Sequence, residues 1–115
     1  MLKKLFVAVL LLSTFAFAVD KATEAEIDHL LAYVKKTECK YIRNGTVHDG
    51  QEAAEHIKAK YDHYKDEIKT TEDFIRLSAT QSLISGKKYY IECTGQEKMQ
   101  SSQWLLEELK RFRSK

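Results

Sequence analysis

Near the middle of the chain, four polar residues form the group best suited to bind a ligand: Arg43, Asn44, His48 and Asp49. A guanidinium, an imidazole and the free backbone N–H groups of a helix start can together receive an anionic group. The same residues also fit structural roles, because Asn44 with Gly45 forms a hairpin turn and Asp49 a helix N-cap. Arg43 and His48 would then pair across two strands. The sequence leaves both interpretations open and favours the structural one.

Two histidine–carboxylate pairs on one predicted helix raise the question of metal binding: Glu52 with His56, and His63 with Glu67. Each pair has the i,i+4 spacing that can place two ligands on a zinc or copper ion. The pairs span about 16 Å of helix, however, which is too far for both to hold one ion. We therefore expect no metal ligands and no cofactor, and interpret these residues as the solvated flank of the helix.

Catalytic motifs are missing from the sequence. The serines lie in neither a G-x-S-x-G nor an S-x-x-K pattern, and the glycines are too scattered for a phosphate-binding loop. An enzyme is therefore not indicated, and we expect no catalytic residue. The alternative is a small hydrolase that uses His48 or His56 as its acid or base. A pocket that holds either histidine with a perturbed pKa would favour that alternative.

The first eighteen residues have the layout of a cleavable secretory signal peptide. Two lysines precede an apolar run over residues 5–12, and the small-residue pattern Ala16-Phe17-Ala18 follows. A membrane anchor would need about 20 apolar residues, more than this run supplies. We therefore predict cleavage after Ala18, a periplasmic or secreted location, and a single compact domain over residues 19–115. No stable membrane insertion is expected after cleavage.

Cys39 and Cys93 are the two cysteines of the chain, and an even count in an exported protein is most simply explained by a disulfide. The bond would close a loop of about 55 residues and stabilise the fold by roughly 4 kcal/mol. Neither cysteine has the C-x-x-C spacing or the His/Cys cluster of a reactive or metal-binding thiol. A structural disulfide is therefore predicted.

Positive and negative charges nearly balance, with 19 Lys and Arg against 17 Asp and Glu in the whole chain. Removal of residues 1–18 would take away two of the lysines. The remaining charges are interspersed, so the sequence shows no basic stripe that would capture nucleic acid or anionic lipid. We expect no nucleic-acid partner, and look instead to an envelope protein, a peptide or a small ligand.

Apolar periodicity and turn signals predict an α+β fold of about four helices packed on a small antiparallel sheet. Helices are expected over residues 24–36, 50–68 and 71–85, and from Ser101 or Ser102 to the C-terminus. Capping residues precede these helices, and two of them form predicted capping boxes, Thr23 with Glu26 and Thr70 with Asp73. Strands are expected over residues 39–43, 46–48 and 89–94, with a loop over residues 95–100. The first two strands would form a hairpin at Asn44-Gly45.

Four segments of the chain carry a family resemblance: YIRNGTVHDGQEAAEHIKAK at 41–60, TTEDFIRLSATQSLISG at 70–86, YYIECTG at 89–95 and SSQWLLEEL at 101–109. In order and spacing they resemble a family of small exported bacterial proteins, domain of unknown function 5329 (DUF5329). The resemblance covers nearly all of residues 19–115. It implies a signal peptide and a compact secreted domain, and it brings no activity, substrate or catalytic residue.

A non-catalytic binding module of the periplasm or the secreted fraction is the function that these observations favour. Its ligand would meet the four polar residues around the predicted hairpin. Besides the hydrolase, a metal-binding protein that uses one His–Glu pair is an alternative. Four aromatic residues could also line a groove for a peptide or glycan, although such residues more often belong to a core: Tyr61, Tyr89, Tyr90 and Trp104.

Overall fold

Four helices and four short strands make up residues 19–115, the part of the chain that the computed structural model describes. The helices are α2 (Lys21–Lys36), α3 (Gly50–His63), α4 (Thr71–Ser78) and α5 (Ser101–Arg113), and a 3-10 turn, η3 (Lys65–Glu67), follows α3. The strands are β1 (Lys40–Arg43), β2 (Thr46–His48), β3 (Tyr90–Glu92) and β4 (Met99–Gln100). The predicted α+β fold class is confirmed, whereas the predicted signal peptide lies outside the described residues. None of the described helices is long and apolar enough to cross a membrane.

The strands form one antiparallel sheet in the order β2-β1-β3-β4. The predicted hairpin joins β1 to β2, and Asn44 and Gly45 at its turn have φ angles of 51° and 78°. Glycine adopts positive φ freely and asparagine tolerates it, which is why this pair makes the turn. The predicted loop over residues 95–100 is wrong at its end, because Met99 and Gln100 pair with β3. A two-residue strand has too little alternation to be recognised in a sequence.

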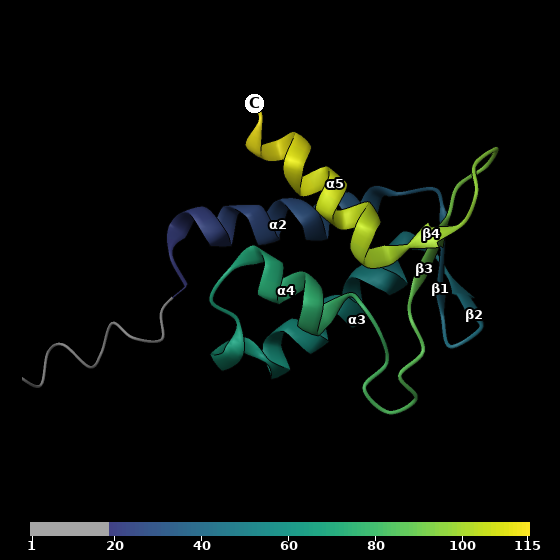
Figure 1. Cartoon of the computed structure of the whole chain (residues 1–115), viewed down its shortest axis with the longest axis horizontal. Coiled ribbons are helices and arrows are strands. Elements are labelled where there is room, and N and C mark those ends of the chain that lie inside the picture. The colour runs from purple at the N-terminus through teal and green to yellow at the C-terminus, as the bar shows by residue number, and fades with distance from the viewer. Residues whose placement is uncertain (1–18) are drawn as a thin grey trace, which may run out of the picture.

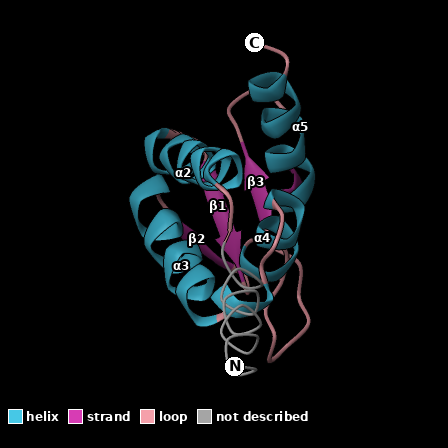
Figure 2. Ribbon diagram, turned by 90° about the vertical axis from the view of Figure 1, so that its left-hand side faces the viewer, coloured by secondary structure: helices cyan, strands magenta, loops and turns pink. Residues whose placement is uncertain are grey.

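The helices cover one face of the sheet and leave the other face open (Figures 1 and 2). Helices α3 and α5 contact the strands, and α2 and α4 pack against those two helices. Because strand residues alternate between the faces, Tyr41 and Ile91 are buried under the helices, while Ile42 and Tyr90 are half-buried on the open face. The core thus lies between the sheet and the four helices. It includes Ile27, Leu30, Val34, Ile57, Tyr61, Phe74, Tyr89, Trp104, Leu105 and Leu109.

Side chains cap three of the helices. Asp49 accepts a 2.8 Å hydrogen bond from a backbone N–H in the first turn of α3, so the predicted N-cap is confirmed. Thr70 and Asp73 form the predicted capping box of α4. Helix α2 begins earlier than predicted, with Asp20 as its N-cap and a 2.7 Å bond from the N–H of Thr23. The predicted capping box at Thr23 is therefore wrong.

Two predicted capping residues bind partners that are distant in the sequence instead. Glu26 accepts hydrogen bonds from Thr71 on α4 and from Arg113 at the end of α5. Ser101 shares a 2.7 Å hydrogen bond with the buried hydroxyl of Tyr41, and α5 begins at Ser101 without a side-chain cap. A buried hydroxyl without a partner is costly, so the tertiary contact decides the orientation of Ser101.

Helices α3 and α4 both end earlier than their apolar patterns predict. Helix α3 ends at His63, and η3 brings the chain to the buried Ile68. Helix α4 ends at Ser78, and residues 79–89 form the α4–β3 loop. Leu83 and Ile84 extend the helical spacing of α4, but their side chains are exposed. Without burial of that apolar face, a further helical turn gains little stability.

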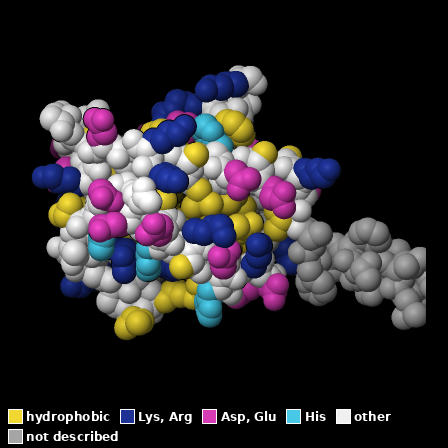
Figure 3. All heavy atoms as spheres, turned by 180° about the vertical axis from the view of Figure 1, so that it is seen from behind, with side chains coloured by type: hydrophobic (Ala, Val, Ile, Leu, Met, Phe, Trp, Pro, Cys, Tyr) yellow, Lys and Arg dark blue, Asp and Glu magenta, His cyan; other side chains and the backbone are white. Residues whose placement is uncertain are grey.

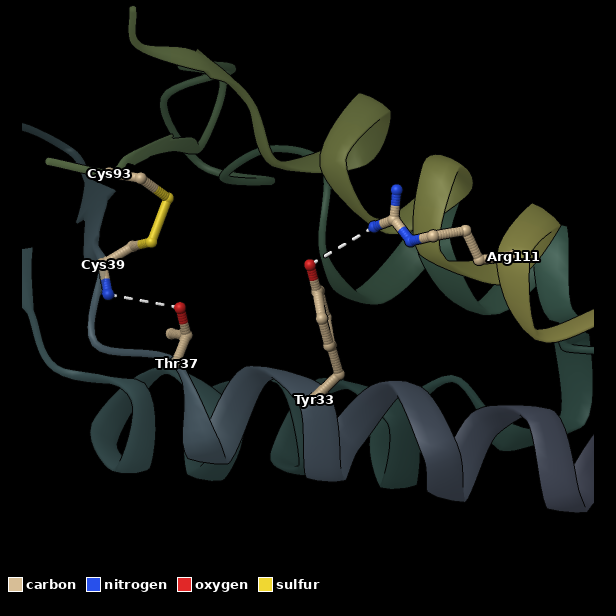
Figure 4. Close-up of a disulfide and its surroundings, with 5 residues drawn as sticks. All are labelled: Tyr33, Thr37, Cys39, Cys93 and Arg111. Atoms are coloured by element: carbon tan, nitrogen blue, oxygen red, sulfur yellow. Dashed lines mark hydrogen bonds between the residues drawn. A yellow bond between two sulfur atoms is a disulfide. The ribbon is translucent and has the colours of Figure 1, made fainter. Parts of the chain in front are cut away.

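A disulfide joins Cys39, which precedes β1, to Cys93, which follows β3 (Figure 4). Both cysteines are half-buried against the core. The bond crosslinks the chain at the end of the β1–β3 pair and across 54 positions of sequence. Close by, the backbone N–H of Cys39 donates to the hydroxyl of Thr37, and Arg111 donates to the hydroxyl of Tyr33. The predicted disulfide is confirmed.

Candidate functional site

A hollow of about 320 Å³ lies between the β1–β2 hairpin, helix α3 and the α4–β3 loop. We name it the Tyr89 pocket. Its lining brings together Arg43 from β1 and two residues of α3, His56 and Lys60. None of the described residues that line it carries a carboxylate. The remaining lining residues are Asn44, Ser82, Leu83, Ile84 and Tyr89.

Tyr89 joins the polar groups from α3. His56 and Lys60 are one helical turn apart, so both side chains leave the same face of α3. The Tyr89 hydroxyl lies 3.5 Å from Nε2 of His56 and accepts a 3.3 Å hydrogen bond from Nζ of Lys60. Lys60 also donates to the backbone carbonyl of Gln81 at 2.8 Å. This network holds the lysine against the α4–β3 loop.

Arg43 enters the site from the helix-facing side of β1. Its Nη1 lies 3.5 Å from Nε2 of His48, and Nδ1 of His48 lies 3.3 Å from a carboxylate oxygen of Glu52. Its Nε is buried and has no hydrogen-bond partner within residues 19–115. A buried donor without an acceptor is costly, so an acceptor brought to this nitrogen would gain more than one offered to an exposed donor.

Burial and positive charge together shift the pKa values in the pocket. Burial is the main reason that the pKa of His56 falls to about 4, and the positive charges of Arg43 and Lys60 add to the effect. Burial and Arg43 also lower the pKa of Lys60. Burial raises the pKa of Tyr89, although Arg43 opposes that shift. Near neutral pH His56 is therefore uncharged, and the positive charge of the pocket comes from Arg43 and Lys60.

We expect stability to depend on pH through His56. Its pKa is about 4 in the folded chain, below the unfolded value of about 6.5, so the unfolded chain binds more protons between those values. The free energy of unfolding therefore has its full value above about pH 6.5. It decreases by about 1 kcal/mol, for this partly exposed side chain, as the pH falls toward 4. Urea unfolding at several pH values will measure it. In His56→Gln the decline between pH 6.5 and 5 should disappear; an unchanged decline would contradict the assignment.

The structure separates the four residues that the sequence grouped. Arg43 and Asn44 line the Tyr89 pocket. His48 touches Arg43 from beside the pocket, and Asp49 caps α3 and does not line it. Sequence reasoning placed neither Lys60 nor Ser82 in a site, and it considered Tyr89 only as one of four aromatic residues that could line a groove. The one signal for Lys60 is its position one turn after His56, beside the apolar stripe of α3.

Substitutions of Asp49 and Arg43 should separate the cap from the pocket. Asp49→Ala removes the acceptor of a first-turn N–H of α3, and we expect a loss of about 1 kcal/mol in the free energy of unfolding. Arg43→Ala should lower the free energy of unfolding by less than about 0.5 kcal/mol. The variant loses packing contacts, but it also removes the repulsion between Arg43 and Lys60 and the buried Nε that has no acceptor. Urea denaturation of both variants measures the difference. A larger loss for Arg43→Ala would make Arg43 a structural residue.

The two histidine–carboxylate pairs that the sequence placed on one helix do not converge, because Glu67 lies in η3, beyond the end of α3. Glu52 contacts His48, outside α3, and the ring of His63 packs against that of Tyr64. Within residues 19–115, no group of three or more His, Cys, Asp or Glu side chains is arranged to hold a metal ion. The geometry of these side chains gives the metal-binding alternative no support.

A second polar cluster, absent from the sequence-based hypotheses, connects α2 to α5. The buried Glu108 lies 2.6 Å from Nε2 of His29 and accepts a 2.8 Å hydrogen bond from Arg111. Burial opposes ionisation of Glu108, but these two partners hold its pKa below the ordinary value. The ring of His29 also stacks on Phe112, with centroids 4.1 Å apart. Both carboxylate oxygens of Glu108 thus have partners, and the cluster links α2 to α5.

These features define a small disulfide-linked α+β protein with a basic pocket beside its β-hairpin. The chain belongs to DUF5329, a family of unknown function whose model matches residues 21–113, and this confirms the resemblance noted in the sequence. It is similar to the uncharacterized protein YfeK of Salmonella typhimurium strain LT2, with 38% identity in an alignment over 92 residues that covers 76% of this chain and 77% of the relative. No solved structure matches the chain.

Proposed function

We propose that the protein is a non-catalytic binding module of the periplasm or the secreted fraction, and that its Tyr89 pocket receives a small anionic group. The observation that carries the proposal is the convergence of Arg43, His56 and Lys60 around a hollow whose described lining has no carboxylate. The unpaired Nε of Arg43 adds a donor that is already desolvated. Phosphate and carboxylate oxygens are the acceptors that guanidinium and ammonium groups prefer.

The disulfide supports the proposed location. Disulfides form and persist in the periplasm and outside the cell, and are rare where thioredoxin and glutathione keep thiols reduced. The N-terminal eighteen residues have the composition of an export signal. Mass spectrometry of the exported protein should find Val19 as its first residue.

Binding of inorganic phosphate, measured by calorimetry and by NMR shifts of the pocket residues, tests the proposed function. Loss of a charged hydrogen-bond donor should weaken binding about tenfold in Arg43→Gln and in Lys60→Gln. Lys58→Gln is the matched control, because Lys58 lies on the same helix but pairs with Asp62 at its exposed surface. Phosphate should also raise the pKa of His56. Equal weakening by Lys58→Gln, or no shift at the pocket residues, would refute the pocket as the site.

One observation favours the hydrolase alternative: His56 lies in a pocket and has a perturbed pKa. Its surroundings nevertheless suit a general base poorly. The carboxylate Glu52 contacts His48 and not His56, and a pKa of about 4 is too low for efficient proton abstraction at neutral pH. Hydrolysis of activated esters and phosphate esters that is abolished by His56→Gln would establish the enzyme in place of the binding module.

A further inference from the structure

A second basic hollow lies on the other side of Asn44, at the open face of the sheet. It has a volume of about 490 Å³, and three lysines line it: Lys87, Lys88 and Lys98. None of its described lining residues is acidic. Its apolar floor includes Tyr90, whose ring centroid is 5.0 Å from Nζ of Lys98. The α4–β3 loop and the β3–β4 turn thus bring together lysines that the sequence separates by up to eleven positions.

Exposed apolar side chains lie on the loop that carries Lys87 and Lys88 and on the adjoining hairpin. Ile84 is 99% exposed and Leu83 is 57% exposed, both on the α4–β3 loop, and Val47 of the adjoining hairpin is 56% exposed. These are three of the four large apolar residues that are exposed among residues 19–115; the fourth is Leu106 on α5. Figure 3 shows apolar side chains projecting from the lower edge of the molecule, where this loop lies in Figure 1. Single exposed apolar residues are common, whereas two adjacent ones at the tip of a loop, Leu83 and Ile84, present apolar surface to a partner.

Hydrogen bonds hold the α4–β3 loop in the shape that exposes Ile84. The hydroxyl of the buried Ser82 accepts from the backbone N–H groups of Ile84 at 3.3 Å and Ser85 at 3.2 Å. The carbonyl of Ser82 accepts from Gly86 at 2.9 Å. The hydroxyl of Ser85 donates to the side chain of Asn44 at 2.8 Å, which ties the loop to the hairpin. The apolar tip is therefore presented by a bonded turn.

The open sheet face continues this surface. In the strand register Ile42 is opposite both Val47 on β2 and Tyr90 on β3, so an apolar row crosses three strands on the side that no helix covers (Figure 1). Glu92, an acidic residue of the same face, is paired in the register with Lys40. We name the loop tip, the apolar row and the three lysines together the loop–sheet face.

We propose that the loop–sheet face docks on the surface of an anionic lipid bilayer. Leu83 and Ile84 would enter the boundary between headgroups and acyl chains, and the lysines would meet the lipid phosphates. Charge complementarity favours this occupant, because no carboxylate lines the hollow that holds the three lysines, and Glu92 on the same face is opposite Lys40. Apolar side chains flanked by lysines are the usual pattern of interfacial binding. Leu83 and Ile84 also line the Tyr89 pocket, but the docking does not require that pocket to bind an anion. It is adsorption to the surface and not insertion across the membrane.

Vesicle sedimentation tests this docking. The protein, processed by an exporting host and with its N-terminus checked by mass spectrometry, is mixed with vesicles of phosphatidylglycerol or of phosphatidylcholine. We expect binding to the anionic vesicles that weakens with salt. The double variant Lys87→Gln/Lys88→Gln should lose about 25-fold in affinity, since each lysine near an anionic surface contributes about fivefold. Ile84→Ser should lose about tenfold, because an isoleucine that enters the bilayer is removed from water.

Matched controls lie on α5, away from the loop–sheet face. Leu106→Ser and Lys110→Gln each remove an exposed side chain of the same type and should leave vesicle binding unchanged. Every variant is also checked for an unchanged thermal melt. Equal binding to both lipids, or equal losses in the α5 controls, would overturn the proposal.

Phosphate binding at the Tyr89 pocket is measured separately from vesicle binding. Arg43→Gln should weaken binding of free phosphate and retain vesicle binding. If Arg43→Gln abolishes vesicle binding while Lys87→Gln/Lys88→Gln retains it, the pocket recognises the lipid and the loop–sheet face does not, which also overturns the proposal.

Discussion

Reduction of the Cys39–Cys93 disulfide is expected to lower the free energy of unfolding by about 4 kcal/mol. The bond spans 54 positions of sequence, so it removes many conformations from the unfolded chain and few from the folded one. Small domains are stabilised by about 5–15 kcal/mol in total. The reduced protein should therefore unfold at a much lower urea concentration.

Two measurements test this expectation together. Urea unfolding is followed with and without a reducing agent, and the variant Cys39→Ser/Cys93→Ser is unfolded under the same conditions. The reduced wild type and the double variant should agree closely, because both lack the crosslink. Mass spectrometry should show that the oxidised protein is lighter than the reduced one by two hydrogens. An unchanged midpoint on reduction would contradict the prediction.

Gly50→Ala is expected to destabilise the protein by about 3 kcal/mol. Gly50 is buried at the first position of α3, where this helix meets the end of α2. A Cβ atom there would lie 2.4 Å from the carbonyl oxygen of Val34 and 2.9 Å from those of Lys35 and Thr37. These are backbone atoms, so they cannot move aside as a flexible side chain can. The two helices would have to separate.

The sign of this effect distinguishes packing from helix propensity. Alanine is a better helix former than glycine by about 1 kcal/mol, so propensity alone predicts that Gly50→Ala stabilises the protein. The neighbouring, exposed Gln51 is the control, and Gln51→Ala should change stability by less than about 0.5 kcal/mol. Chemical denaturation of both variants measures the effects. A stabilised Gly50→Ala would show that α2 and α3 do not approach this closely.

Features of secondary structure that depend on neighbouring residues could be predicted from the sequence. The Asn44-Gly45 turn follows from the φ angles that these residues tolerate. The cap at Asp49 and the capping box at Thr70 follow from side chains that reach backbone groups three residues away. Each needs only a few residues of one segment, so tertiary packing has little to change.

Boundaries that depend on packing could not be predicted. The spacing of Leu83 and Ile84 continues the apolar pattern of α4, yet nothing in the described structure covers them and the helix ends at Ser78. Ser101 has the side chain of a helix cap, but the buried hydroxyl of Tyr41 is its partner. In both cases local preferences of small energy gave way to the larger energies of burial.

The sequence by itself determined the fold class, the hairpin, two helix caps and the cysteine pair, because each of these depends on local preferences or on residue counts. It also grouped Arg43 with Asn44, and both line the Tyr89 pocket. Only the tertiary structure joined Arg43 to His56, Lys60 and Tyr89, and collected Lys87, Lys88 and Lys98 on one face. A charge acts on whatever lies within several ångströms of it in space. The charge character of a surface is therefore settled only when the chain folds.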